Sequence, residues 1–165
     1  MFATAPVHPL QSKRDQYSEL ASQARGLFEG ERDAAANSAN LAALLFHGLP
    51  ALNWAGFYWM KGGELVLGAF QGKPACVRIA LGRGVCGTAA RERRTIVVPD
   101  VSQFPGHIAC DSASASEVVV PIVAGGRVVG VLDLDSPRPG RFDDEDARGL
   151  EALVHLYLAA SDLGS

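Results

Sequence analysis

The sequence predicts an α+β domain, in which an antiparallel β-sheet carries helices from the N- and C-terminal ends of the chain on one face. Three observations support this class. Two amphipathic patterns at helical spacing come first, two pairs of apolar runs joined by glycine turns follow, and a long amphipathic pattern closes the chain. Because the terminal helices would pack on one face of the sheet, we expect a ligand pocket on the other.

The first two elements are predicted helices. Residues 17–28 and residues 34–47 each place alanine and leucine side chains at helical spacing on one face. Gly48 and Pro50 end the second pattern, because glycine commonly follows a helix and proline cannot continue one.

The strands are predicted mainly from hairpin patterns. Apolar runs that flank a short glycine-rich turn are typical of two antiparallel neighbours, and this pattern occurs twice. The expected strands flank Lys61-Gly62-Gly63, occupy residues 76–81, lie in the segment TIVVP that ends at Pro99, and occupy residues 117–123 and 127–135.

Two helical segments complete the prediction. The segment GRGVCGTAARERR indicates a glycine turn that opens a short helix, with Cys86 at its start. Between this helix and the last one, residues 101–116 form an expected loop, because they show no apolar periodicity. Loops of this length in a compact domain are usually functional. The last helix is expected from about Asp144 to Ala160, capped by Asp143 and acidic in its first turn.

Length and charge restrict the function. The 165 residues suit one domain, which we place at residues 15–165 after an N-terminal arm of residues 1–14. A formal net charge of −3 with scattered lysine and arginine argues against a nucleic-acid surface. Neither a signal peptide nor an apolar run of about 20 residues is present, so a cytoplasmic location is expected.

The three cysteines all lie between Cys76 and Cys110. In the cytoplasm such thiols are more often catalytic, redox-active or metal-binding than structural. Cys86, at a helix N-terminus, is expected to have a lowered pKa, unless it is a small core side chain. Cys110, in the long loop, is the preferred nucleophile. His107 either assists a thiolate or makes a structural hydrogen bond, and Cys76 faces either the core or the pocket.

A zinc site is the main chemical alternative, because three cysteines and His107 offer four ligands. Compact structural zinc sites usually pair ligands two to four residues apart, and only His107 and Cys110 approach that spacing. The sequence therefore predicts no metal site.

A group of acidic and aromatic strand residues forms the second candidate cluster. Asp133 and Asp135 share a strand face, and Glu117 at the head of the partner strand could join them. Buried carboxylates require a cationic ligand or a raised pKa, whereas solvated strand ends require neither. Trp54 and Tyr58 also share a face and could wall the same pocket, although aromatic strand residues are more often core.

Several motifs together resemble a known family. The segments FQGKPACVRIALGRGVCGTAA, VVPDVSQFPGHIACDSASASEVVVPI, GVLDLDSP and RFDDED resemble the free methionine-(R)-sulfoxide reductases, which are single GAF domains. The resemblance runs from about Tyr17 to the last helix and includes all three cysteines. It implies a GAF-like fold and an enzyme of oxidant defence that reduces free L-methionine (R)-sulfoxide. It implies no cofactor beyond thioredoxin or another dithiol as electron donor.

The resemblance also implies roles for the thiols. In the family a cysteine thiolate attacks the sulfoxide sulfur, and the resulting sulfenic acid is resolved by a second cysteine to a disulfide that thioredoxin reduces. By motif, Cys110 would attack, and either Cys76 or Cys86 would resolve.

The other matched positions imply a substrate-binding set. Glu117 and Asp135 would hydrogen-bond or protonate the sulfoxide oxygen, and Asp133 would hold the substrate's ammonium group. Trp54 and Tyr58 would enclose the methyl-sulfoxide end.

The alternative function is a non-enzymatic GAF domain that binds a small ligand for sensing. Its weakness is that the chain shows no output domain and that a sensor has no need of three thiols around one loop. A homodimer is compatible with the sequence, which does not fix the oligomeric state.

Overall fold

The computed structural model describes residues 3–108 and 111–164. The described part contains the following elements: α1 (Lys13–Phe28), α2 (Ala34–Gly48), β1 (Trp54–Lys61), β2 (Glu64–Gly72), β3 (Arg78–Ala80), α3 (Gly84–Glu92), β4 (Ile96–Val98), the 3₁₀ helix η1 (Val101–Gln103), β5 (Ser116–Ala124), β6 (Arg127–Ser136) and α4 (Asp144–Ala160).

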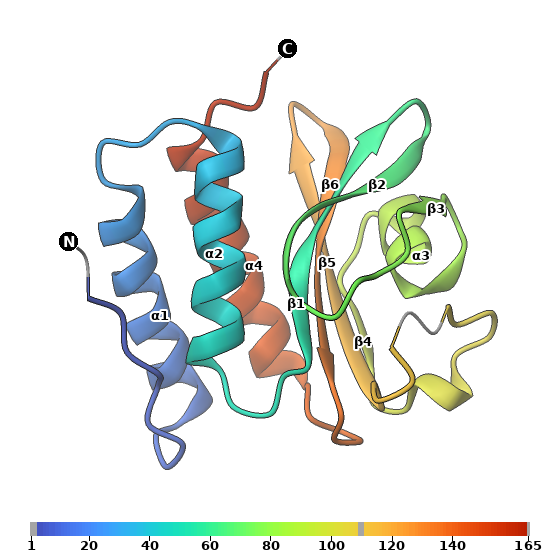
Figure 1. Ribbon diagram of the computed structural model, residues 1–165, viewed down its shortest axis with the longest axis horizontal. Helices are drawn as coiled ribbons and strands as arrows, with labels where there is room; N and C mark the ends of the chain where they lie inside the picture. The colour runs from blue at the N-terminus through green and yellow to red at the C-terminus, as the bar shows by residue number, and fades with distance from the viewer. Residues whose placement is uncertain (1–2, 109–110, 165) are drawn as a thin grey trace.

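The strands form one sheet in the order β3-β2-β1-β6-β5-β4, and each neighbouring pair is antiparallel. Helices α2 and α4 pack directly on one face of the sheet, α1 packs against α2 and α4 on the side away from the sheet, and α3 lies on the other face of the sheet (Figure 1). Both predicted hairpins, β1-β2 and β5-β6, are present. The predicted α+β class, with terminal helices on one face, is confirmed.

The two faces of the sheet contact two separate clusters of buried apolar side chains. One cluster joins the three helices α1, α2 and α4 to one another and to the sheet, and the other lies between the sheet and α3. Alternation along β1 directs Phe57 and Trp59 toward Tyr157 of α4, whereas Trp54 and Tyr58 belong to the second cluster. The second cluster therefore borders the face that was expected to hold a pocket.

Several element boundaries differ from the predicted ones by one residue, and those of α1 and β3 differ by more. Helix α1 begins at Lys13 rather than near residue 17, because the Ser12 hydroxyl accepts a hydrogen bond from the Asp15 amide and caps the helix. Strand β3 spans only Arg78–Ala80 instead of residues 76–81, because its pairing with β2 is confined to three residues. The domain boundary at residue 15 stays a prediction.

Part of the predicted arm packs against the domain. Val7 is 4% exposed, and its amide donates a hydrogen bond to the Gly48 carbonyl at 3.1 Å. The residues around Val7 thus contribute to the helical layer. Within the described residues, no helix is both long and apolar enough to cross a membrane.

Candidate active site

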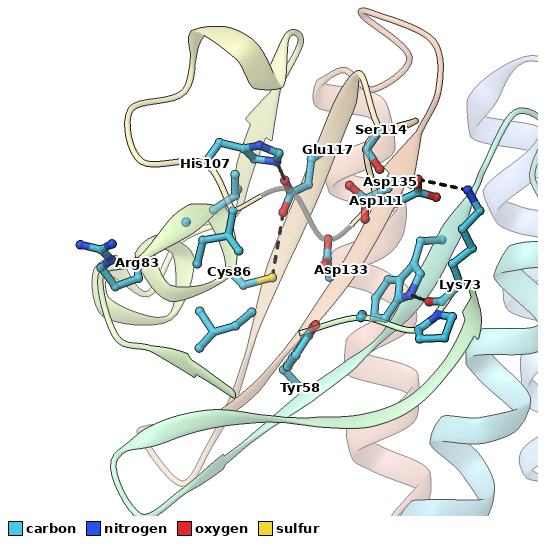
Figure 2. Close-up of a pocket in the computed structure, with 17 residues that line it drawn as sticks. Tyr58, Lys73, Arg83, Cys86, His107, Asp111, Ser114, Glu117, Asp133 and Asp135 are labelled. Carbon is cyan, nitrogen blue, oxygen red and sulfur yellow. Dashed lines mark hydrogen bonds and ion pairs between the residues drawn. The ribbon is translucent and has the colours of Figure 1, made fainter. Parts of the chain in front are cut away.

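A pocket opens on the sheet face opposite the three covering helices, between the sheet, α3 and the loop that contains His107 (Figure 2). It brings together the predicted aromatic pair, the three predicted acids and one predicted cysteine. These lining residues are Trp54, Tyr58, Cys86, Glu117, Asp133 and Asp135.

Strand register explains why the three acids meet. Glu117 of β5 pairs with Asp135 of β6, and Trp54 of β1 pairs with Asp135 from the other side. Asp133 lies two residues before Asp135, so its side chain projects from the same face. The two-residue period and the antiparallel pairing therefore place a row of carboxyl groups beside an aromatic side chain.

The pocket strongly perturbs these carboxyl groups. Glu117 and Asp133 are each 6% exposed. Burial raises the pKa of Glu117 well above its usual value, and the nearby Asp135 raises it further. Burial, then the Glu117 charge, raises the pKa of Asp133, and burial followed by the Asp133 charge raises that of Asp135. The raised pKa values favour the neutral carboxylic acids, which can donate hydrogen bonds.

His107 contacts this cluster rather than standing alone. Its Nε2 lies 3.2 Å from Glu117 Oε2. Burial lowers the pKa of His107 while that of Glu117 is raised, so the contact is a hydrogen bond between neutral groups more than an ion pair. The sequence left two roles open for His107, assistance to a thiolate or a structural hydrogen bond. The contact that the structure describes is a hydrogen bond to the Glu117 carboxyl group.

Cys86 is the third residue of α3 and is a free thiol, 4% exposed. Its Sγ lies 4.0 Å from Glu117 Oε1, to which the thiol donates. Burial raises the pKa of the thiol well above its usual value, with further contributions from Asp133 and Glu117. The expectation of a lowered pKa was wrong, because desolvation and two neighbouring acids outweigh the helix dipole.

Close packing of α3 against the sheet edge fixes the position of Cys86. A Cβ on Gly87 would lie 2.3 Å from the Ala80 carbonyl oxygen, so only glycine allows the helix to approach β3 this closely. Gly84 has a φ of +58°, and a Cβ there would lie 3.2 Å from Ile108. The two glycines thus let α3 pack close to β3 and Ile108, and this packing determines where Cys86 lies in the pocket wall.

Of the other two cysteines, only Cys76 lies within the described residues. Cys76 is half-buried, packs against the second apolar cluster and is disulfide-bonded, and its carbonyl accepts a hydrogen bond from the Tyr58 hydroxyl at 3.0 Å. Cys110, the predicted nucleophile, lies outside the described residues.

The aromatic wall is rigid. The rings of Trp54 and Tyr58 stack with centroids 5.9 Å apart, and Phe70 stacks on the Trp54 ring at 5.4 Å. The Trp54 indole donates to the Lys73 carbonyl at 3.1 Å, and burial raises the pKa of Tyr58 above its usual value, so its phenol stays protonated.

The pocket mouth contains residues that the sequence analysis did not single out. Lys73 Nζ lies 3.4 Å from Asp111 Oδ1, and the Asn53 amide donates to Asp111 Oδ2 at 3.2 Å. Ser114 also lines the pocket and accepts from Asn53 at 3.0 Å. Lys73 and Asp111 lie inside the quoted motifs, but no periodicity relates two loop residues that are far apart in the chain.

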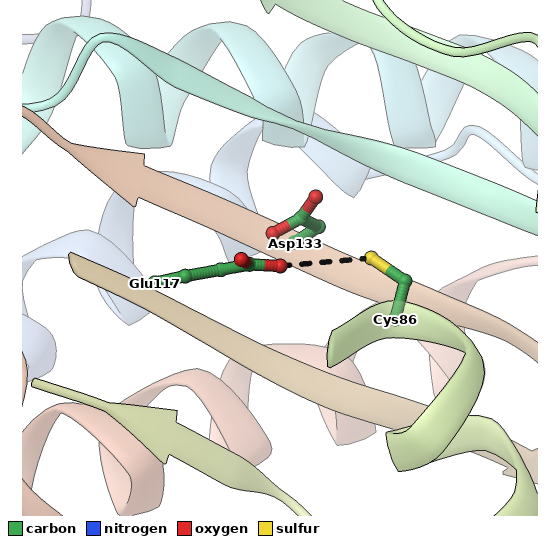
Figure 3. A group of neighbouring side chains, drawn as sticks. All are labelled: Cys86, Glu117 and Asp133. Atoms are coloured by element: carbon green, nitrogen blue, oxygen red, sulfur yellow. Dashed lines mark hydrogen bonds between the residues drawn. The ribbon is translucent and has the colours of Figure 1, made fainter. Parts of the chain in front are cut away.

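One group of side chains in the pocket could hold a metal ion. The candidate ligand atoms of Cys86, Glu117 and Asp133 all lie within 4.8 Å of one another (Figure 3). This group shares only Cys86 with the set of three cysteines and His107 that spacing argued against.

Comparison with known proteins gives the family. Residues 35–160 match the GAF domain family. A free methionine-R-sulfoxide reductase of Escherichia coli is 50% identical over 143 residues, which cover 87% of this chain and 87% of that protein. A solved structure described as a putative GAF sensor protein from Burkholderia vietnamiensis is 60% identical, has a TM-score of 0.88, and covers 92% of this chain and 96% of its own.

A second solved structure is a free methionine-R-sulfoxide reductase from Neisseria meningitidis in complex with its substrate. It is 42% identical to this chain, with a TM-score of 0.92, and the match covers 97% of this chain and 95% of that one. The chain therefore belongs to the GAF domain family and, within it, to the free methionine-R-sulfoxide reductases.

Proposed function

We propose that this protein reduces free L-methionine (R)-sulfoxide to methionine, with electrons supplied by cysteine thiols. The observation that carries the proposal is the row of buried carboxyl groups, whose pKa values burial raises, beside a stacked aromatic pair in one pocket. Reduction of a sulfoxide requires proton donors at the oxygen and an apolar surface at the methyl group. The described pocket offers both, and the named activity of the Escherichia coli and Neisseria meningitidis relatives supports the same reaction.

The three acids divide into two roles when substrate binds. An ammonium group next to Asp133 favours its ionised form, because an opposite charge offsets the loss of hydration. Glu117 and Asp135 then remain protonated beside that new negative charge and donate hydrogen bonds to the sulfoxide oxygen. Trp54 and Tyr58 pack against the methyl end.

The chemical step that we propose uses Cys110 as nucleophile. Its thiolate attacks the sulfoxide sulfur, and the oxygen takes a proton from the acid cluster. The hydroxyl then passes to the cysteine sulfur as its bond to the methionine sulfur breaks, which releases methionine and leaves a cysteine sulfenic acid. A second thiol then attacks the sulfenic sulfur, which forms a disulfide and releases water. An external dithiol, such as that of thioredoxin, returns the disulfide to two thiols, so each sulfoxide consumes two electrons and two protons.

We propose Cys76 as the resolving cysteine. Cys76 is only half-buried and is disulfide-bonded, which supports access to an external reductant and formation of the required bond. Cys86 is a free thiol, buried beside two acids, and its raised pKa lowers the fraction of thiolate that could attack the sulfenic acid. The alternative of Cys86 as the resolving residue is therefore disfavoured.

A stoichiometric assay without external reductant tests these assignments. Fully reduced protein is mixed with excess free methionine sulfoxide, and the methionine formed and the thiols lost per chain are counted. We expect one methionine and two thiols for the unmodified protein and for Cys86→Ser, and no methionine for Cys110→Ser. Cys76→Ser should form one methionine and a sulfenic acid that dimedone traps. A protein that binds the sulfoxide but forms no methionine would instead support ligand sensing.

A further inference from the structure

Cys86 is a buried thiol that the proposed reaction does not use. It stands in the pocket with two acids, on three different elements: Cys86 on α3, Glu117 on β5 and Asp133 on β6 (Figure 3). We propose that these three side chains form a binding site for a soft or borderline divalent cation such as Zn²⁺, with one thiolate and two carboxylates as ligands.

The geometry suits such an ion. All three ligand atoms lie within 4.8 Å of one another, and Cys86 Sγ is 4.0 Å from Glu117 Oε1. Zinc bonds of about 2.0–2.3 Å place tetrahedral ligands roughly 3.3–3.8 Å apart, so small side-chain rotations close the site. Its ligands come from a helix and two interior strands of the sheet, each of which is paired on both sides.

An unsatisfied acceptor in the cluster points independently to a cationic ligand. Asp133 is 6% exposed, and its Oδ1 is buried without a hydrogen-bond partner among the residues that the structure describes. A buried carboxyl oxygen without a hydrogen-bond partner is costly, and a bound cation, which displaces the carboxyl proton, satisfies it. The cluster therefore has the unfilled bonding capacity of a ligand site as well as the right atoms.

A neighbouring histidine supports the same assignment. His107 Nε2 lies 3.2 Å from Glu117 Oε2, the oxygen that does not contact Cys86. Contacts of this kind hold a ligating carboxylate in one orientation, and their loss typically weakens metal binding by about 10–100-fold. Three protein ligands also leave a coordination position open toward the pocket.

The site has an inhibitory consequence that rests on the proposed function. Glu117 and Asp133 are the residues that we assign to the sulfoxide oxygen and the ammonium group, so the cation and the substrate exclude each other. Zn²⁺ should therefore raise the sulfoxide concentration needed for half-maximal single-turnover rate and leave the limiting rate unchanged. Cation binding itself does not depend on the reductase activity.

Metal titration of a single-thiol protein tests the site. The Cys76→Ser/Cys110→Ser double variant leaves Cys86 as the sole cysteine of the chain. We expect Cd²⁺ to produce a thiolate charge-transfer absorption that saturates at one ion per chain, and equilibrium dialysis to show one bound Zn²⁺. Added free methionine sulfoxide should displace the ion.

Two further variants locate the ligands. Cys86→Ser in the same background should abolish the charge-transfer band, and Asp133→Asn should weaken Zn²⁺ binding by about tenfold or more, since it removes a charged ligand. Asp111→Asn changes another acid of the same pocket and should leave the affinity unchanged.

The proposal is overturned if the single-thiol protein binds no ion. It is equally overturned if Zn²⁺ binding is unaffected by both Cys86→Ser and Asp133→Asn. A protein that binds the ion but reduces no sulfoxide would preserve the metal site and refute the proposed function, so the two failures are distinguishable.

Discussion

At the scale of single residues, Glu117 has the most demanding position. It is buried, hydrogen-bonded to His107 and opposite Asp135 in the strand register. If it protonates the sulfoxide oxygen, Glu117→Gln should lower kcat/KM for free methionine (R)-sulfoxide by about 10²–10⁴-fold, the usual contribution of a positioned general acid. Steady-state kinetics measure the loss. Glu64→Gln, which changes an exposed glutamate paired with Arg78, is the matched control and should retain full activity.

The acid cluster also predicts how stability depends on pH. Asp133 has a usual pKa of 3.8 and Glu117 one of 4.5, and both are raised in the folded protein. The folded state thus binds more protons than the unfolded state above about pH 4. This contribution to stability is complete below the unfolded pKa values and is lost as pH rises through the folded ones.

Asp133→Asn removes one of these titrating groups. As pH rises above the usual aspartate pKa of 3.8, the free energy of unfolding of the unmodified protein should therefore fall more steeply than that of the variant. Urea unfolding at several pH values gives both curves. Parallel curves would show that Asp133 is not held in its protonated form.

The identity of the pocket residues could be predicted from the sequence more reliably than their electrostatic state. Motif and strand alternation together predict that Trp54, Tyr58 and the three acids share one pocket, and all five line it. The direction of the Cys86 pKa shift was predicted wrongly. The position of Cys86 at a helix start can be read from the sequence, but its burial next to Glu117 and Asp133, which raises the pKa, depends on tertiary packing.

At the scale of elements, the approach of α3 to β3 decides where Cys86 lies. A methyl group on Gly87 would meet the Ala80 carbonyl oxygen at 2.3 Å, so helix or strand must move. Gly87→Ala should destabilise the protein by about 1–3 kcal/mol, as overpacking usually does, and should lower activity by displacing the pocket wall. Chemical denaturation and kinetics test both effects. Gly164→Ala has open space around its Cβ and should change neither.

Element type was predictable where local patterns are strong. Glycine turns identified both hairpins, and the acidic first turn after Asp143 identified α4, whose N-terminus carries a full capping box with Asp146. Boundaries were less accurate. The extent of β3 depends on how many residues find a partner on β2, which no local pattern contains.

At the scale of the whole molecule, the pocket depends on strands that are far apart in the chain. Strand β1 pairs with β6 at the centre of the sheet, which sets Trp54 beside Asp135. Periodicity predicts which side chains share a face, but the order of strands follows from tertiary packing. The family resemblance supplied this missing information, and the structural match to relatives confirms the fold.

Enclosure of the whole substrate predicts selectivity for the free amino acid. The walls come from β1, α3, β5, β6 and the loops around Lys73 and Asp111. If Asp133 holds the ammonium group, as we propose, a peptide-linked sulfoxide lacks that group and leaves the Asp133 carboxylate without its partner. N-acetylmethionine (R)-sulfoxide should therefore be reduced with a kcat/KM about 10⁴-fold lower than that of the free amino acid. Comparable turnover of the two compounds would mean that Asp133 does not hold an ammonium group.

The most direct test of the account is turnover of the separated R and S isomers of free methionine sulfoxide, with thioredoxin or dithiothreitol as reductant, by the unmodified protein and by Cys110→Ala. If the acids protonate the sulfoxide oxygen and the aromatic pair holds the methyl group, as we propose, only one isomer can direct its oxygen toward the acids. We expect consumption of the R isomer alone, and none by the variant. Reduction of neither isomer, or equal reduction of both, would contradict the assignment of this pocket as a stereospecific reductase site.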